Sequence, residues 1–129
     1  MEWQFANDAP IYAQLIEQIK VAIVTGVYPG GSRLPSVREL AAEAGVNPNT
    51  MQRAMTELER GGLVYSQRTA GRFVTEDGAM LMRTKQELAL SHVRTFLDAM
   101  LQLKLQEEEI ITLLRQETKK EDVHVSSGM

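Results

Sequence analysis

The chain contains no cysteine, which excludes a disulfide framework, thiolate metal ligands and cysteine nucleophiles. It also lacks a phosphate-binding loop, a nucleophile elbow and a zinc-ligand spacing, so we expect no enzymatic activity, no cofactor and no bound metal. No uninterrupted apolar run approaches the roughly 20 residues that span a bilayer, and the N-terminus has no signal-peptide pattern. We therefore expect a cytoplasmic protein without a membrane partner.

The sequence has no large excess of one charge, since its formal net charge is −3 at pH 7. The charges are nevertheless unevenly spread. Residues 76–129 carry seven Lys and Arg against ten Asp and Glu, a net of −3, whereas residues 33–72 carry six Arg against four Glu, a net of +2. Because Arg suits forked contacts with phosphate and guanine, the middle of the chain is compatible with nucleic acid.

Two short helices around a tight turn are predicted in this basic region. Ser36 can cap the first helix, with Glu39 three residues later to complete a capping box. Gly45 ends that helix in a left-handed conformation. Asn47 caps the second helix, and Pro48 takes its first position, where a missing N–H costs nothing. This arrangement is typical of a helix-turn-helix.

The other elements complete a mainly α fold with a small β-wing. They are a helix over roughly 10–25, strands at 63–65 and 72–75, a long helix over roughly 79–104 and a shorter one over roughly 107–119. We predict a winged helix-turn-helix domain over 1–76, followed by a two-helix dimerisation extension over 77–129. The polar residues 120–129 are expected to fray.

Polar side chains on the free face of the second helix suit DNA bases. Asn and Gln can pair twice with adenine, Arg can fork onto guanine, and Thr can touch base or phosphate. The preceding helix and the basic hairpin would bind the DNA backbone and position the reading helix. A plain three-helix domain with a solvated polar face is the less favoured alternative. The residues expected to contact DNA are Ser36, Arg38, Asn47, Asn49, Thr50, Gln52, Arg53, Gln67, Arg68 and Arg72.

Three segments, 34–41, 45–54 and 58–64, resemble the winged helix of GntR-family bacterial regulators. The Asn-Pro-Asn-Thr start at 47–50 and the short C-terminal part resemble the YtrA subfamily. The resemblance implies a homodimeric, usually repressing factor that also contacts DNA through the wing from Thr69 to Gly71. This sequence departs from the commoner family pattern at Pro48, where many members carry a base-reading Arg, and at 68–72 in the wing.

The apolar arc on the 79–104 helix is wider than one core contact needs. The helix either packs only on the winged domain and the 107–119 helix, or forms a two-fold interface. We favour the interface, because a palindromic operator matches a two-fold protein. Roughly 50 residues are too few to enclose a sensor pocket, so no small-molecule effector is indicated, although a site at the dimer interface stays an alternative. The predicted interface residues are Leu88, Val93, Phe96, Leu97, Met100, Ile110 and Leu114.

Other features have ordinary structural interpretations. The acids at 107–109 are expected to complement the helix dipole rather than bind metal. We expect His92 to form a hydrogen bond at the interface, and His124 to lie in solvent. Trp3 and Phe5 are expected to pack on the first domain, or else to help a partner chain or the DNA backbone. A protein-interaction module that does not read DNA is the main competing function.

Overall fold

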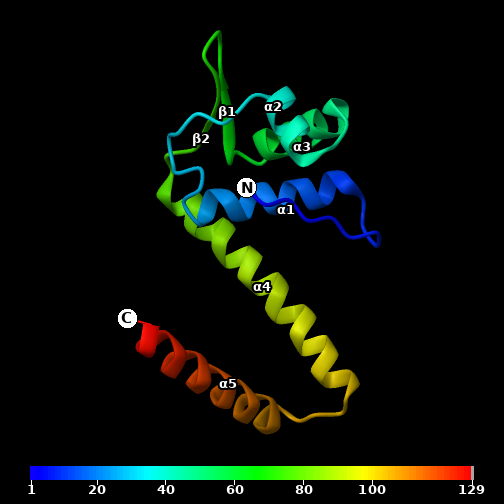
Figure 1. The fold of residues 1–129 in the computed structure, drawn as a ribbon, viewed down its shortest axis with the longest axis vertical. Coiled ribbons are helices and arrows are strands. Elements are labelled where there is room, and N and C mark those ends of the chain that lie inside the picture. Colours follow the sequence, from blue (N-terminus) through cyan, green and yellow to red (C-terminus); the bar gives the residue numbers. More distant parts are fainter. Residues whose placement is uncertain (129) are drawn as a thin grey trace. The chain divides into compact units, whose positions relative to one another are not determined.

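The computed structural model describes the backbone of residues 1–128 and the side chains of residues 1–120. The fold is mainly helical with one two-stranded antiparallel sheet, as predicted (Figure 1). The chain divides into two compact units, one from Met1 to Ala89 and the other from Leu90 onward, and each is described by itself. The elements are α1 (Ile11–Val24), α2 (Val37–Ala44), α3 (Pro48–Arg60), β1 (Val64–Gln67), β2 (Gly71–Val74), α4 (Gly78–Gln102) and α5 (Glu107–Gly128).

The first unit is held together by the inner faces of α1, α2 and α3. One apolar cluster at the centre of these helices also takes in residues of the wing strands. Trp3 and Phe5 pack against this cluster from the N-terminal segment, which confirms the first interpretation of these two residues. The indole of Trp3 also donates a hydrogen bond to the Glu43 carboxylate at 3.1 Å. Fully buried side chains of the cluster include Leu15, Ile19, Leu40, Met51, Met55, Val64 and Val74.

The turn between α2 and α3 has the predicted caps. The Ser36 hydroxyl accepts a hydrogen bond from the Glu39 amide at 3.1 Å, and it donates one to the Glu39 carboxylate at 3.2 Å. Gly45 has a φ of 71° and a ψ of 35°, the left-handed conformation in which glycine avoids a Cβ clash. The Asn47 side chain accepts from the Asn49 amide at 2.8 Å. These contacts fix the angle at which α3 leaves α2.

The wing contains one extended segment more than the sequence predicts. β1 and β2 pair in register from Val64 opposite Val74 to Gln67 opposite Gly71. The linker before α2 then runs along β2, where the Leu34 amide donates to the Arg72 carbonyl and the Val74 amide to the Ser32 carbonyl, both at 2.9 Å. This pairing attaches the base of the wing directly to the chain that enters α2.

The start of α4 belongs to the first unit. Asp77 caps this helix by accepting hydrogen bonds from the amides of Ala79 and Met80 at 3.0 and 3.2 Å. Met80 and Leu81 pack against the apolar cluster, and Thr84 is buried. The first unit therefore continues to Ala89, beyond the boundary at residue 76 that the sequence suggests.

The second unit contains the end of α4 and the whole of α5. The backbone of α5 is helical to Gly128, whereas the sequence predicts a helix that ends near 119. The Glu109 carboxylate accepts a hydrogen bond from the Gln106 amide at 3.0 Å, so one of the three acids caps α5. The His124 side chain lies outside the described residues. Among the described residues, no helix combines the length and apolarity needed to cross a membrane.

Candidate nucleic-acid interface

The outer face of α3 is polar because its inner face is held in the core. Met51, Ala54, Met55 and Leu58 are buried at helical spacing, which leaves the intervening positions outside. Nine side chains predicted to contact DNA are exposed, while Thr50 and Arg72 are half-buried. The exposed ones are Ser36, Arg38, Asn47, Asn49, Gln52, Arg53, Gln67, Arg68 and Thr69.

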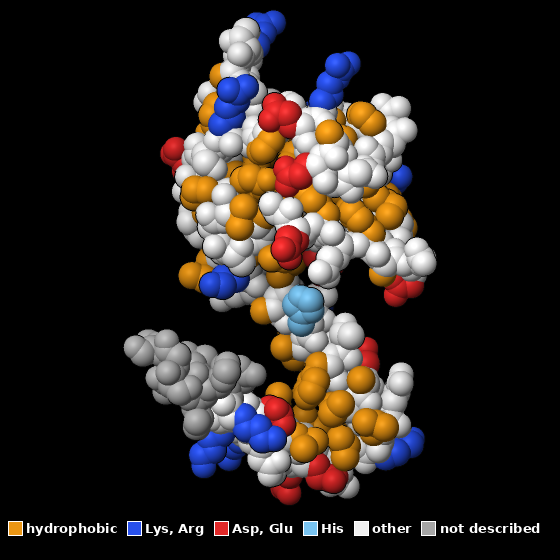
Figure 2. Space-filling view, in the orientation of Figure 1, with side chains coloured by type: hydrophobic (Ala, Val, Ile, Leu, Met, Phe, Trp, Pro, Cys, Tyr) orange, Lys and Arg blue, Asp and Glu red, His pale blue; other side chains and the backbone are white. Residues whose placement is uncertain are grey.

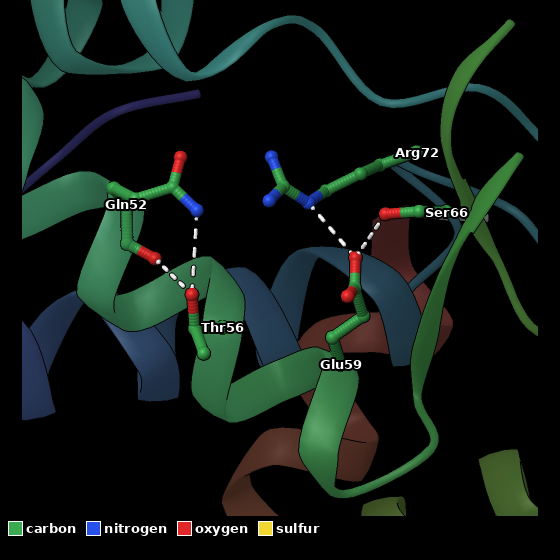
Figure 3. A network of polar contacts seen from close by, with 5 residues as sticks. All are labelled: Gln52, Thr56, Glu59, Ser66 and Arg72. Carbon is green, nitrogen blue, oxygen red and sulfur yellow. Dashed lines mark hydrogen bonds and ion pairs between the residues drawn. The ribbon is translucent and has the colours of Figure 1, made fainter. Parts of the chain in front are cut away.

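Several polar groups on this face are already engaged within the chain. The Asn47 carbonyl oxygen caps α3, so its amide N–H groups are the part left for a ligand. The side-chain amide of Gln52 donates to the Thr56 hydroxyl at 3.3 Å, and that hydroxyl donates to the backbone carbonyl of Gln52 at 2.9 Å (Figure 3). The Asn49 side chain makes no such bond within the described part of the chain, which leaves both its donor and acceptor groups for a ligand.

Arg53 is drawn toward α1. Its guanidinium carbon lies 3.6 Å from the centroid of the Tyr12 ring, a cation–π contact. The predicted DNA contact of Arg53 therefore starts from a side chain that α1 supports, at the edge of the polar face of α3.

A groove of about 540 Å³ lies between the start of α2 and the wing. Within the described part of the chain, no acidic residue lines it. It brings together six of the residues predicted to bind DNA, from two separate stretches of sequence. These six are Ser36, Arg38, Gln67, Thr69, Gly71 and Arg72.

Arg33 also lines the groove, and sequence reasoning missed it. Its backbone pairs with Phe73 of β2, and its Nε would lie 3.0 Å from a Cβ placed on Gly71, so its guanidinium lies beside the start of β2. Gly71 has a φ of 110°, a conformation that favours glycine. A single Arg in a linker carries no periodic signal, and only the pairing of that linker with β2 reveals its position.

The groove has a positive electrostatic character. Arg33 and Arg38 form no ion pair with the acidic side chains of residues 1–120. The start of α2 adds backbone N–H groups and the positive end of the helix dipole. Such a groove is suited to an extended polyanion, and its openness to solvent leaves room for a strand of nucleic acid.

Arg72 differs from Arg33 and Arg38 because it has an acidic partner. Its Nε donates to the Glu59 carboxylate at 3.0 Å, and the Ser66 hydroxyl donates to the same oxygen (Figure 3). The Ser66 hydrogen bond lowers the pKa of Glu59 most, and the Arg72 hydrogen bond and charge lower it further, against the opposing effect of partial burial.

The tip of the wing is exposed and basic. Thr69 has a φ of 67° at the turn, and Arg68 precedes it with an exposed side chain. Figure 2 shows Lys and Arg side chains at the end of the first unit where the hairpin projects. Residues 1–120 contain no cluster of His, Asp and Glu that could hold a metal ion.

The predicted interface residues of the extension differ in exposure. Val93, Leu97 and Leu114 are 47%, 38% and 46% exposed, and Leu88, Phe96 and Met100 are half-buried. Ile110 is only 4% exposed, so the chain itself already covers it. Figure 2 shows hydrophobic side chains gathered on the surface of the second unit. Between residues 90 and 120, the exposed large hydrophobic residues are Leu90, Val93, Leu97, Leu101, Leu103, Ile111, Leu113 and Leu114.

Comparison with known sequences gives a consistent result. Residues 11–74 match the model of a family described as bacterial regulatory proteins, gntR family. The uncharacterized HTH-type transcriptional regulator YhcF of Bacillus subtilis (strain 168) is 38% identical over 111 residues, which cover 86% of this chain and 92% of that protein. The HTH-type transcriptional repressor YtrA of the same strain is 42% identical over 71 residues, 55% of either chain.

Solved structures also resemble this chain. A GntR family transcriptional regulator from Listeria monocytogenes has a TM-score of 0.81 at 38% identity, covering 87% of this chain and 98% of that one. The structure of AraR(DBD) in complex with operator ORX1 has a TM-score of 0.53 at 31% identity, covering 58% of this chain and 96% of that one. The likeness to the Listeria structure therefore includes the helical extension as well as the winged helix.

Proposed function

Since the chain belongs to the GntR family of bacterial regulatory proteins, and is therefore a DNA-binding transcriptional regulator rather than an enzyme, we propose that it is a homodimeric repressor of a palindromic operator. The observation that carries this proposal is the basic groove beside the polar face of α3. The groove on the protein can hold a phosphate backbone of DNA while α3 lies in the adjacent DNA major groove.

The reading of bases is assigned to the start and middle of α3. Asn49 is the main base-reading residue, because its side chain is exposed and its side-chain amide can pair twice with adenine. Gln52 lies one turn further along, and its bond to Thr56 holds its amide in one orientation. Asn47, Thr50 and Arg53 flank these two readers and contact base edges or phosphate.

The DNA backbone is assigned to the groove and the wing. Arg38 and Arg33 supply the charge, and the Ser36 end of α2 supplies backbone N–H groups. The adjacent DNA backbone is contacted by four residues of the wing, Gln67, Arg68, Thr69 and Gly71. These contacts would be the same for any sequence, so they set affinity and register rather than specificity.

The dimer is assigned to the helical extension. Leu90, Val93, Leu97 and Leu101 are exposed and lie three or four residues apart on α4, which places them in one stripe. A contiguous apolar stripe on a monomer marks an interaction surface, and a second copy of the same stripe is its natural partner in a two-fold protein. Leu114 of α5 extends the interface, and the buried Ile110 supports it from within. The repressor YtrA is similar in sequence, which supports the sign of the regulation.

Selection of bound duplexes from random DNA tests the proposal. The expected product is a palindrome with half-sites about one helical turn apart, bound with an affinity that falls steeply as salt rises. A protein-interaction module would instead enrich no sequence and would bind its partner with little dependence on salt. That result would overturn the proposed function.

A further inference from the structure

One carboxylate joins the reading helix to both strands of the wing. Glu59 lies in the last turn of α3, Ser66 in β1 and Arg72 in β2, and the last two face each other in the strand register. A single Glu59 oxygen accepts hydrogen bonds from both side chains (Figure 3). The contact therefore ties three elements together at one point.

The surroundings of this contact favour it over an ordinary surface ion pair. The side chains of Arg72 and Glu59 are 24% and 34% exposed, whereas those of Arg60 and Glu57, a pair on the same helix, are 70% and 39% exposed. Partial burial reduces screening by water and salt. The planar guanidinium also loses less side-chain entropy per hydrogen bond than a flexible lysine ammonium would. Glu59 and Arg72 thus hold a fixed geometry in the free protein.

The position of the wing also determines the position of Arg33. The Leu34 amide donates to the Arg72 carbonyl, and the Arg33 guanidinium lies against Gly71. A shift of β2 away from α3 would therefore carry Arg33 with it and widen the groove opposite Arg38.

We propose that Glu59 is a positioning residue for DNA binding, which clasps both wing strands to α3 and so sets the spacing of Arg33 and Arg38 for the DNA backbone. Arg72 is then a partner of Glu59 and not a phosphate ligand, while Arg33 and Arg38 are the cations that meet phosphate. The inference rests on the proposed function and assigns roles within that same site.

The sign of one effect separates this role from simple electrostatics. Glu59 is a negative charge beside a DNA-binding groove, so by charge alone its removal would strengthen DNA binding. The clasp predicts the opposite. Glu59→Ala is expected to weaken operator binding about tenfold, and Glu59→Gln, which keeps an accepting oxygen without the charge, less than that.

The experiment measures the operator affinity of the full-length protein at several salt concentrations. The variants are Glu59→Ala, Glu59→Gln, Arg72→Ala and the Glu59→Ala, Arg72→Ala double variant, each checked by circular dichroism. Glu57→Gln is the matched control, because it removes a carboxylate from the same helix that contacts Arg60 and not the wing. Its affinity should stay within about twofold of wild type. The double variant should bind no more weakly than Glu59→Ala alone, since the two residues act as one unit.

The salt dependence identifies the phosphate ligands. The slope of log affinity against log salt is negative. Arg33→Ala and Arg38→Ala should each make it less steep by about 1.8, because a dimer loses two phosphate contacts. Arg72→Ala should leave the slope unchanged. The positioning role of Glu59 would be overturned if Arg72→Ala made the slope less steep by the same amount, or if Glu59→Ala raised the affinity. Either result would leave the proposed function standing.

Two further outcomes are also decisive. If the wild-type protein selects no sequence from random DNA, the proposed function is wrong and the positioning role falls with it. If Glu59→Ala does not fold, the comparison of Glu59→Gln with Glu57→Gln decides, because only the former alters the wing. Equal affinities of those two variants would then reject the clasp.

Discussion

The guanidinium of Arg53 lies over the ring of Tyr12, with its central carbon 3.6 Å from the ring centroid. The contact joins the outer edge of α3 to α1 outside the apolar core. It means that a residue expected to face DNA also stabilises the packing of the helix that carries it.

A double-mutant cycle on this pair tests its contribution to stability. Tyr12→Ala should cost about 0.5–1 kcal/mol more in the wild-type background than in an Arg53→Ala background, the usual size of an exposed cation–π contact. Urea unfolding of the four proteins measures the difference. Additive effects of the two substitutions would show that the contact contributes nothing to folding.

Glycine at position 45 is required by backbone conformation and not by space. A Cβ on Gly45 would meet nothing within 4 Å, yet its φ of 71° is strained for other residues. Gly45→Ala should therefore destabilise the fold by about 1 kcal/mol. Gly78→Ala is the matched control, since Gly78 has equal space, begins α4 and has no positive φ. Thermal unfolding should distinguish the two variants, and equal losses would contradict the conformational reason.

The pH dependence of stability should reflect Glu59. Its pKa lies below the ordinary value of about 4.5 in the folded protein, so the carboxylate is favoured by folding. Its contribution is present above pH 4.5 and is lost as the pH falls through the lowered pKa. Unfolding of wild type and Glu59→Gln should therefore differ at neutral pH and converge in acid, whereas a constant difference would exclude this origin.

The apolar stripe of α4 should control the oligomeric state. Leu97→Glu places a charge in the proposed two-fold interface, where burial without a partner is costly. Thr95→Glu makes the same change at an exposed polar position of the same helix. Sedimentation velocity should show monomers for the first variant and dimers for the second. A Leu97→Glu variant that still sediments as a dimer would place the interface elsewhere.

The sequence predicts most of the reading head because its signals are local. Caps such as Ser36 and Asn47 act within three residues, and a helical stripe such as that of Met51 and Leu58 needs only one helix. Pairing between distant segments leaves no such pattern. Arg33 joins the groove through a linker that pairs with β2, and Arg72 turns to Glu59 thirteen residues away.

The extension is less well predicted for a related reason. α5 continues past 119 although residues 120–128 have no apolar stripe, because nothing in that stretch, such as Pro, ends the helix. Ile110 and Leu114 are both large aliphatic residues of α5, yet Ile110 is buried and Leu114 is 46% exposed. Which face of a helix its own chain covers depends on tertiary packing rather than on local periodicity.

Operator binding by the Arg38→Ala, Asn49→Ala double variant tests the central claim most directly. The two substitutions remove one backbone cation of the groove and the leading base reader of α3, and both side chains are exposed, so the fold should survive. Footprinting on the selected palindrome should show no protection, while circular dichroism and sedimentation match those of wild type. A folded, dimeric double variant that still protects the same site would contradict the assignment of this face as the DNA-reading surface.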